Sequence, residues 1–384
     1  MLGTHPVLDT LADLVRIESV NPAYGGGGGE AGEAGMARYI SRFFADREME
    51  TREQAVFPGR RNVIACLPGR NSGRRIVFEA HMDTVSAEGM TISPFEAAID
   101  AGRLYGRGAC DTKGGLAAMM HALVSVKATG IAPPCEIWLA ATVDEEFSYR
   151  GVVKLCEGLT ATAAVVAEPT ELRAVRATKG VLRWRIRARG VAAHSSKPHL
   201  GVNAITHMAR VVLALESDNA ALAGSRHPLL GPATCSVGLI RGGTQVNFVP
   251  HQCEIEVDRR LLPGEAPEDV LRHYSGLLEG LKAGCPALDC VAEPPGIVDA
   301  AMETPGDAAP VRLASEILAE MGLEPTPAGV PFGSDASKLS RHGVPSILFG
   351  PGSIDQAHAA VEFVPCEAVE QAVEFYRQFM LRFE

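Results

Sequence analysis

The sequence predicts an α/β protein in which a main domain, with a mostly parallel sheet covered by helices, is interrupted by a smaller α+β domain. Apolar strand-like runs alternate with helical patterns as far as residue 178 and again near the C-terminus, which is typical of a parallel sheet. Between these regions, segments alternate apolar and charged residues, as half-exposed strands do. The length of 384 residues also favours two domains, because a single core rarely grows that large.

The elements of the main domain follow from the spacing of apolar residues. Leu8, Leu11, Leu14 and Val15 recur at helical intervals and predict an amphipathic helix over 6–17. Short apolar runs such as "IVFEA" predict buried strands. The remaining predicted elements are a helix at 36–47, strands at 61–67 and 75–80, a helix at about 114–128, a strand at 135–142, a helix at 150–158, a strand at 163–167, a helix at 308–321 and a strand at 344–349.

The smaller domain begins with "GVLRWRIRARG", in which apolar and basic residues alternate. There follow a predicted helix at 203–216, strands in "TCSVGLIRGG" and "CEIEVDRRLL", and a helix at 266–282. The Pro- and Gly-containing segment 292–300 has the composition of a linker. We therefore expect one domain at 1–178 and 294–384 and the other at 179–293.

Composition excludes several classes of function. The net charge of −10 argues against a nucleic-acid surface, which needs a basic patch. No run of about 18 apolar residues predicts a membrane span, and the N-terminus lacks the basic and apolar regions of a signal peptide. The nine cysteines are scattered, odd in number and without a CxxC pair, which favours a reducing cytoplasm.

Five consecutive glycines, Gly25–Gly29, separate the first two predicted helices. Such a run is too flexible for regular structure and predicts a surface loop. A phosphate-binding loop is the alternative, but the run lacks the lysine and the strand-then-helix context that this function requires.

Candidate functional residues stand where predicted strands end or loops begin. Ligand sites of open α/β sheets form at the carboxyl ends of strands, so these side chains are expected to converge. The set consists of His81, Asp83, Asp111, Glu145, Glu146, Glu168 and His358.

The residue types indicate a metal site with nitrogen and oxygen ligands. Histidines and carboxylates without cysteine suit zinc, cobalt or manganese. The set is larger than one ion needs, and a shared carboxylate between two ions would use it, with Asp111 as the bridge. Asp83 would then accept the second N–H of His81 and fix its tautomer.

The adjacent acids Glu145 and Glu146 point to opposite sides of an extended segment. One of them can therefore bind metal while the other acts as general base. Each signal alone has a structural explanation. A histidine at a strand end is often structural, a Glu-Glu pair is often a solvated surface, and Asp111 could cap the helix that begins near Lys113.

In their order along the chain these residues resemble the dinuclear zinc amidohydrolases and peptidases that include acetylornithine deacetylase, succinyl-diaminopimelate desuccinylase, aminoacylase and glutamate carboxypeptidase. The matching segments cover nearly the whole chain. They are "HMDTV" (81–85), "GRGACDTKGG" (106–115), "DEE" (144–146), "AEPT" (167–170), "AHSSKPHLGVNAI" (193–205), "VNFVP" (246–250), "VDRRLLPG" (257–264), "GSDA" (333–336) and "GPGSIDQAH" (350–358).

The resemblance implies the roles of the site residues. One zinc is expected at His81, Asp111 and Glu168, and the other at Asp111, Glu146 and His358. Glu145 is the implied general base and Asp83 the partner of His81. The smaller domain is implied to be a lid that mediates homodimer formation. It carries His194, which is implied to donate a hydrogen bond to the oxyanion formed in the partner subunit. The residues implied to bind the substrate are Asn247, Arg260 and Gly333.

The segments "AVRATKG", "AHSSKPHLGVNAI" and "GPGSIDQAH" most resemble the acetylornithine deacetylase branch, so the expected activity is deacylation of an N-acyl amino acid, N-acetylornithine first. A dipeptidase or carboxypeptidase of the same family is the alternative, and an inactive metal-binding homologue a more distant one. The segment after His358, "AAVEFVP", departs from the proline and acid that many relatives carry close behind this histidine. Because of this departure and the glycine run, the sequence does not determine which substrate the protein acts on.

Overall fold

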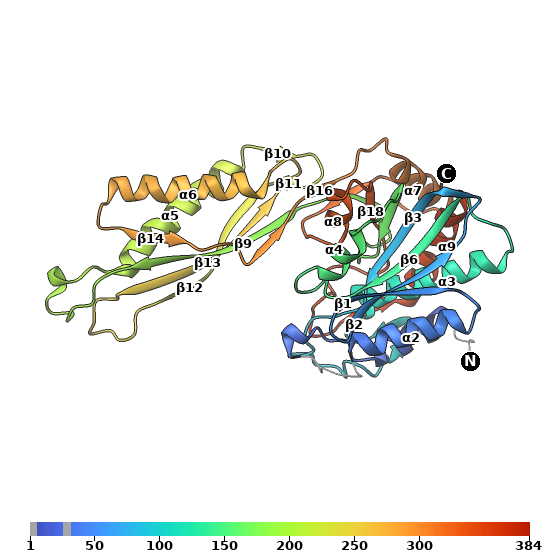
Figure 1. Cartoon of the computed structure of the whole chain (residues 1–384). Helices are drawn as coiled ribbons and strands as arrows, with labels where there is room; N and C mark the ends of the chain where they lie inside the picture. The colour runs from blue at the N-terminus through green and yellow to red at the C-terminus, as the bar shows by residue number, and fades with distance from the viewer. Residues whose placement is uncertain (1–5, 26–31) are drawn as a thin grey trace. The chain divides into compact units, whose positions relative to one another are not determined.

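The computed structural model describes residues 6–25 and 32–384, which form two compact units (Figure 1). Unit 1 comprises the residues up to Arg176 together with 304–328 and 334–384, and unit 2 comprises 177–303 and 329–333. The loop expected at Gly25–Gly29 lies, from residue 26 onward, outside the described residues. The division at 178 and 294 into a catalytic and a lid domain stays a prediction.

Unit 1 is built on a sheet with the strand order β1-β2-β6-β3-β7-β18-β8. Its centre, β6-β3-β7-β18, is parallel, as expected, whereas β1, β2 and β8 pair in the antiparallel direction. Strand β1 was not predicted, because its polar sequence lacks an apolar run. The strands are β1 Thr51–Phe57, β2 Arg60–Leu67, β3 Asn71–His81, β6 Cys135–Thr142, β7 Ala163–Val166, β8 Val175–Thr178 and β18 Ser346–Leu348.

Helices cover both faces of this sheet, so its central strands are buried on both sides. On one face pack α1 Pro6–Arg16, α2 Glu33–Ala45, α3 Gly114–Ala128, α7 Ala309–Glu320 and α9 Cys366–Arg382. On the other face pack α4 Arg150–Cys156 and α8 Ala336–Arg341. Helix α9, which the sequence analysis missed, packs along α3 and closes the core.

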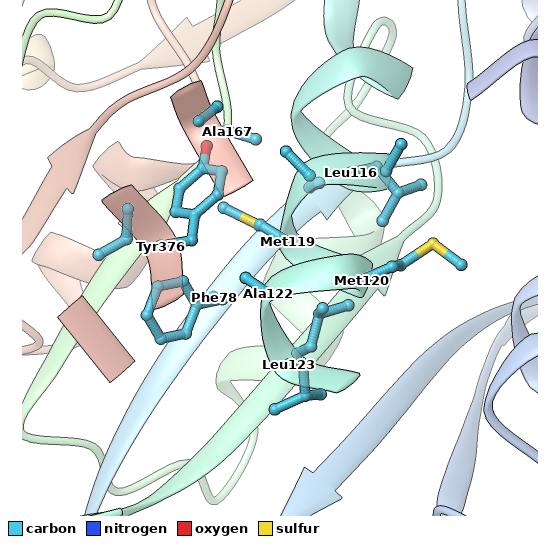
Figure 2. Close-up of a cluster of buried hydrophobic side chains, with 14 of the residues drawn as sticks. Phe78, Leu116, Met119, Met120, Ala122, Leu123, Ala167 and Tyr376 are labelled. Atoms are coloured by element: carbon cyan, nitrogen blue, oxygen red, sulfur yellow. The ribbon is translucent and has the colours of Figure 1, made fainter. Parts of the chain in front are cut away.

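The core of unit 1 holds the functional end of β3 against α3. Figure 2 shows Met119 and Ala122 of α3 beside Phe78 of β3 and Tyr376 of α9. The rings of Phe78 and Tyr376 meet edge to face at 6.0 Å, and the Tyr376 hydroxyl donates to the carbonyl of Phe349. Burying each large apolar side chain contributes about 1.5–3 kcal/mol, so this contact fixes the strand that ends at the candidate site.

Unit 2 is an antiparallel sheet with the order β12-β13-β9-β14, and β15 also pairs with β9. Helices α5 and α6 lie on one face of this sheet (Figure 1). The alternation predicted for β9 is confirmed, because every second residue from Leu182 is buried beneath these helices. The elements are β9 Gly180–Arg189, α5 Ala204–Leu222, β12 Thr234–Gly242, β13 Gln252–Leu261, α6 Pro267–Gly284, β14 Asp289–Ala292 and β15 Ile297–Asp299.

A small second sheet in unit 1 has the order β19-β5-β4, and its strands lie close to Asp111 and His358 in sequence. No helix among residues 6–25 and 32–384 is long and apolar enough to cross a membrane. The remaining strands are β4 Ile99–Asp100, β5 Arg103–Tyr105, β10 Arg226–His227, β11 Gly231–Pro232, β16 Met302–Glu303, β17 Ala328–Val330 and β19 Phe363–Pro365.

Candidate metal centre

Four neighbouring parallel strands end at the same edge of the unit 1 sheet, and each delivers a candidate ligand there. His81 is the last residue of β3, and Glu168 follows β7 by two residues. Glu145 and Glu146 lie in the loop after β6, and His358 lies in the loop after β18. The convergence expected from the sequence is therefore a consequence of strand order.

Asp111 comes from the segment that leads into α3, and its carboxylate lies between the two histidines. Its Oδ1 is 3.1 Å from His81 Nε2, and its Oδ2 is 3.3 Å from His358 Nε2. The Nε2 of His358 is also 3.2 Å from Glu146 Oε1. A carboxylate that presents one oxygen to each histidine has the geometry expected of a ligand shared by two ions.

The backbone ahead of Asp111 requires glycine at one position. Gly108 has φ +81°, and a Cβ there would lie 2.7 Å from Cγ2 of Thr84. The Asp111–Thr112 peptide bond is cis. The hydroxyl of Thr112 donates to the carbonyl of Ala167, one residue before a candidate ligand, so this segment is tied to the end of β7.

Three overlapping groups of side chains could each hold an ion. In each group the ligand atoms lie within 4.8 Å of one another. The groups are His81, Asp111 and Glu168; Asp111, Glu146 and His358; and His81, Glu145 and Glu146. The first two share Asp111, and they contain all five predicted ligands.

The hydrogen bond of His81 supports a cation beside its other nitrogen. Nδ1 lies 3.0 Å from the carbonyl oxygen of Asp83, which accepts only, so Nδ1 carries the proton. In the neutral ring, Nε2 then presents a lone pair to Asp111. Two facing acceptors repel unless a cation or a proton lies between them. A metal ion there would be coordinated by both, so the donor set fits such an ion.

The role expected of the Asp83 carboxylate needs correction. Its Oδ1 is 3.7 Å from His81 Nδ1, beyond hydrogen-bond distance, and the Asp83 carbonyl makes that bond instead. The carboxylate accepts the backbone N–H groups of Glu145 and Glu146, both at 3.1 Å, and the side-chain amide of Asn21 at 2.8 Å. Asp83 therefore fixes the segment that carries both adjacent acids.

The site is short of positive charge. Burial raises the pKa of Glu145 and of Glu168 well above the usual range, and neighbouring acids add to the effect. Hydrogen bonds to Asp111 and Glu146 raise the pKa of His358 to about 10. Glu168 is 4% exposed and Glu145 8% exposed, so water screens these charges poorly. Divalent cations would supply the missing charge.

The remaining predicted residues lie in unit 2. His194 is exposed, accepts a hydrogen bond from the Ser196 backbone and forms a backbone bridge with Phe248. The neighbouring residue donates its N–H to the carbonyl of Asn247, so these two segments lie side by side. Arg260 pairs with Asp258 at 2.7 Å. Gly333 packs against Asp299, where a Cβ would lie 2.3 Å from the carboxylate.

Three residues near the centre were missed from the sequence. Asn21 contacts Asp83, and the hydroxyl of Tyr24 donates to the carbonyl of Glu146. Glu362 is fully buried and accepts N–H groups of the Asp111 segment. Only Glu362 carries a sequence signal: a lone acid inside the apolar run "VEFV", four residues after His358.

Comparison with known proteins identifies relatives over most of the chain. Residues 77–382 match the model of peptidase family M20/M25/M40. Acetylornithine deacetylase from Myxococcus xanthus is 34% identical over 329 residues, which are 80% of this chain and 82% of that protein. Acetylornithine deacetylase from Proteus mirabilis is 31% identical over 336 residues, or 85% and 83% of the two chains.

Solved structures show the same fold. A tripeptidase from Staphylococcus aureus aligns with a TM-score of 0.80 at 22% identity, covering 97% of this chain and 96% of that one. A dinuclear metal-binding peptidase of the M20 family from Bacillus subtilis aligns with a TM-score of 0.75 at 18% identity, covering 99% and 98%.

Proposed function

Because the chain belongs to peptidase family M20/M25/M40 and is a metal-dependent amidohydrolase, we propose that it removes the acyl group from an N-acyl amino acid, with N-acetylornithine as the first candidate substrate. One observation carries the chemistry: the Asp111 carboxylate lies between the two histidines, with one oxygen toward each. The substrate class is supported by the acetylornithine deacetylases among the relatives.

In this proposal two divalent ions share the centre. His81, Asp111 and Glu168 hold one, and Asp111, Glu146 and His358 hold the other. Zinc is the first candidate because the ligands are imidazoles and carboxylates, and cobalt and manganese are the alternatives. Bound there, the ions supply Lewis acidity at the scissile carbonyl.

Glu145 is the proposed general base. Its neighbour Glu146 contacts His358, whereas Glu145 makes no such contact and remains available to the attacking water. Burial raises the pKa of its carboxyl, and cations bound beside it would lower that pKa and keep the proton acceptor ionised. Asp83, through the two backbone N–H groups it accepts, fixes where this base stands.

Unit 2 supplies the proposed substrate contacts. Asn247 and Gly333 line the binding site, and Arg260 binds the free carboxylate, because a guanidinium fork matches both oxygens. His194 donates to the oxyanion of the partner subunit in a homodimer formed through unit 2. Exposed apolar side chains on this unit, including Leu239 at 46% and Ile240 at 56%, support such an interface.

The second candidate activity is that of a dipeptidase or carboxypeptidase with the same ligands. It leaves the amide chemistry unchanged and alters only the groups on either side of the bond. An inactive homologue would lack a ligand or the base, but all five ligand candidates and Glu145 are present. We place the enzyme in the cytoplasm, since none of the nine cysteines forms a disulfide.

The test is metal analysis coupled to a substrate panel. Protein loaded with zinc, cobalt or manganese is assayed on N-acetylornithine, other N-acetyl amino acids and dipeptides. We expect up to two ions per chain and the highest kcat/KM on an N-acetyl amino acid. A higher kcat/KM on dipeptides would favour the second candidate, and protein that binds only trace metal would refute both.

Subunit exchange tests the homodimer. Inactive Glu145→Ala subunits are mixed with inactive His194→Ala subunits. A heterodimer then contains one site with an intact base and an intact partner histidine, and activity should return in part. If labelled subunits exchange and the mixture stays inactive, His194 does not act across the interface.

A further inference from the structure

The segment after His358 contains a buried acid, Glu362, that is 0% exposed. Its Oε1 accepts the backbone N–H groups of Cys110 at 3.0 Å and of Asp111 at 3.1 Å. Its Oε2 accepts the Nη1 of Arg107 at 2.7 Å. All three contacts are with donors, so this carboxylate is satisfied by the chain itself and is not placed as a ligand.

The same residue joins two further segments to the centre. Its carbonyl accepts the N–H of Gly106 at 3.1 Å, and the next residue begins β19, which pairs with β5. Arg107, 2% exposed, uses its Nε to donate to the carbonyl of Ser86, three residues after Asp83. One ion pair therefore ties together the loop after β3, the loop before α3 and the loop after β18.

These contacts bear on the ligands directly. Asp111 belongs to both groups that the proposed function assigns to an ion, and His358 belongs to one of them. Glu362 bonds the main chain of the first and stands four residues from the second, so its hydrogen bonds limit how far the two segments can separate. Charge-assisted hydrogen bonds of this kind are stronger than neutral ones and hold a segment in one geometry.

We propose that Glu362 is a positioning residue of the metal centre: it fixes the main chain of Asp111 relative to His358, so that the shared carboxylate can face both ions. This inference rests on the ligand assignment of the proposed function. The acid in "AAVEFVP" is thereby given a role, since Glu362 is the fourth residue after His358 and bonds the segment of Asp111.

The test compares Glu362→Gln and Glu362→Asp with the wild-type chain. Gln keeps the shape but removes the charge that Arg107 requires, and Asp keeps the charge but shortens the reach to the N–H groups. Zn²⁺ and Co²⁺ are titrated into metal-free protein by calorimetry. We expect both variants to bind about 10–100-fold more weakly, as typical for residues that support ligands. The visible absorption of the Co²⁺-loaded variants should also change, because it reports ligand geometry.

The matched control is Glu265→Gln in unit 2. Like Glu362, Glu265 accepts hydrogen bonds from a buried arginine, Arg259, and from a backbone N–H group, that of Leu262. Its loss should leave metal affinity and the Co²⁺ spectrum unchanged. If Glu362→Gln does not fold, Glu362→Asp carries the same measurements.

Thermal unfolding separates positioning from general stability. A purely structural role lowers Tm equally with and without metal, so the metal-induced rise in Tm stays as in wild type. That result, or unchanged affinity and spectrum, would overturn the proposal for Glu362 alone. Wild-type protein that binds no metal would overturn the proposed function and this inference together. A smaller metal-induced rise in the variants, with the control normal, supports it.

Discussion

The metal centre of unit 1 and the uncovered face of the unit 2 sheet both gather many charged side chains, but they hold them in opposite ways. In the centre, the carboxylates of three glutamates and Asp111 are buried, and the side chains grouped with them are two histidines. On the sheet, three outward arginines of β9 each face an acid of β13. These pairs, which we call the charge ladder, are Arg183–Asp258, Arg185–Glu256 and Arg187–Glu254.

The difference separates a cluster that costs folding free energy from one that is nearly neutral. Buried carboxylates without counter-charge are unfavourable, and a folded chain retains them where a bound cation offsets the cost. Paired charges on a half-exposed face are solvated and contribute little. Uncompensated burial therefore points to the functional cluster, whereas the number of charges does not.

The largest effect expected is that of Glu145→Gln. The change keeps the size of the side chain and removes the proton acceptor, and general base catalysis typically contributes about 10²–10⁴-fold. We expect kcat to fall at the upper end of that range while metal content stays at the wild-type level. Activity within tenfold of wild type would show that Glu145 is not the base. It would also contradict the conclusion that uncompensated burial identifies the functional residues.

Metal binding should stabilise the metal centre against local unfolding and leave the local stability of the charge ladder unchanged. At a free-metal concentration 100 times Kd, a single site raises the free energy of unfolding by about 2.7 kcal/mol. Hydrogen exchange should slow at residues 81–83 and 107–111 and not at 183–187, which lie in the other unit. Addition of a chelator should reverse the effect. Equal slowing in both regions would indicate that the ions bind elsewhere as well.

Arg260→Ala tests whether this arginine belongs to the site or to the ladder. A hydrogen bond to a charged group contributes about 1.5–3 kcal/mol, so kcat/KM on a free-acid substrate should fall by about 10–100-fold, and by much less on the corresponding amide. Arg183→Ala is the control, because Arg183 binds the same acid, Asp258. Equal losses for both substrates, or for both variants, would contradict the carboxylate contact.

The smallest effect is expected in the ladder itself. A double-mutant cycle on Arg185→Ala and Glu256→Ala should give a coupling energy of about 0.2–1 kcal/mol, and added salt should reduce it. The measurement is urea unfolding of the four proteins at two salt concentrations. A salt-insensitive coupling of several kcal/mol would mean that this face is covered in solution and resembles the metal centre more than the structure indicates.

Much of the centre could be predicted because its signals are local. A buried strand that ends in His81, adjacent acids after another strand and an acid before a helix are visible in the order of residue types. The polar strand β1 and helix α9 were missed, the first because a strand with few apolar residues leaves little periodicity. The predicted hydrogen-bond partner of the Asp83 carboxylate was wrong, because its actual donors are backbone N–H groups more than 60 residues away in the sequence.

The sequence alone therefore determined the class of fold, the ligand types and the chemistry they favour, because these depend on side-chain identity and short-range periodicity. Tertiary structure alone decided that Asp111 faces both histidines, that Asp83 holds the segment of the base and that Glu362 holds the segment of Asp111. Those contacts arise where strand order brings distant segments together, and a buried polar group bonds whichever donor that packing supplies.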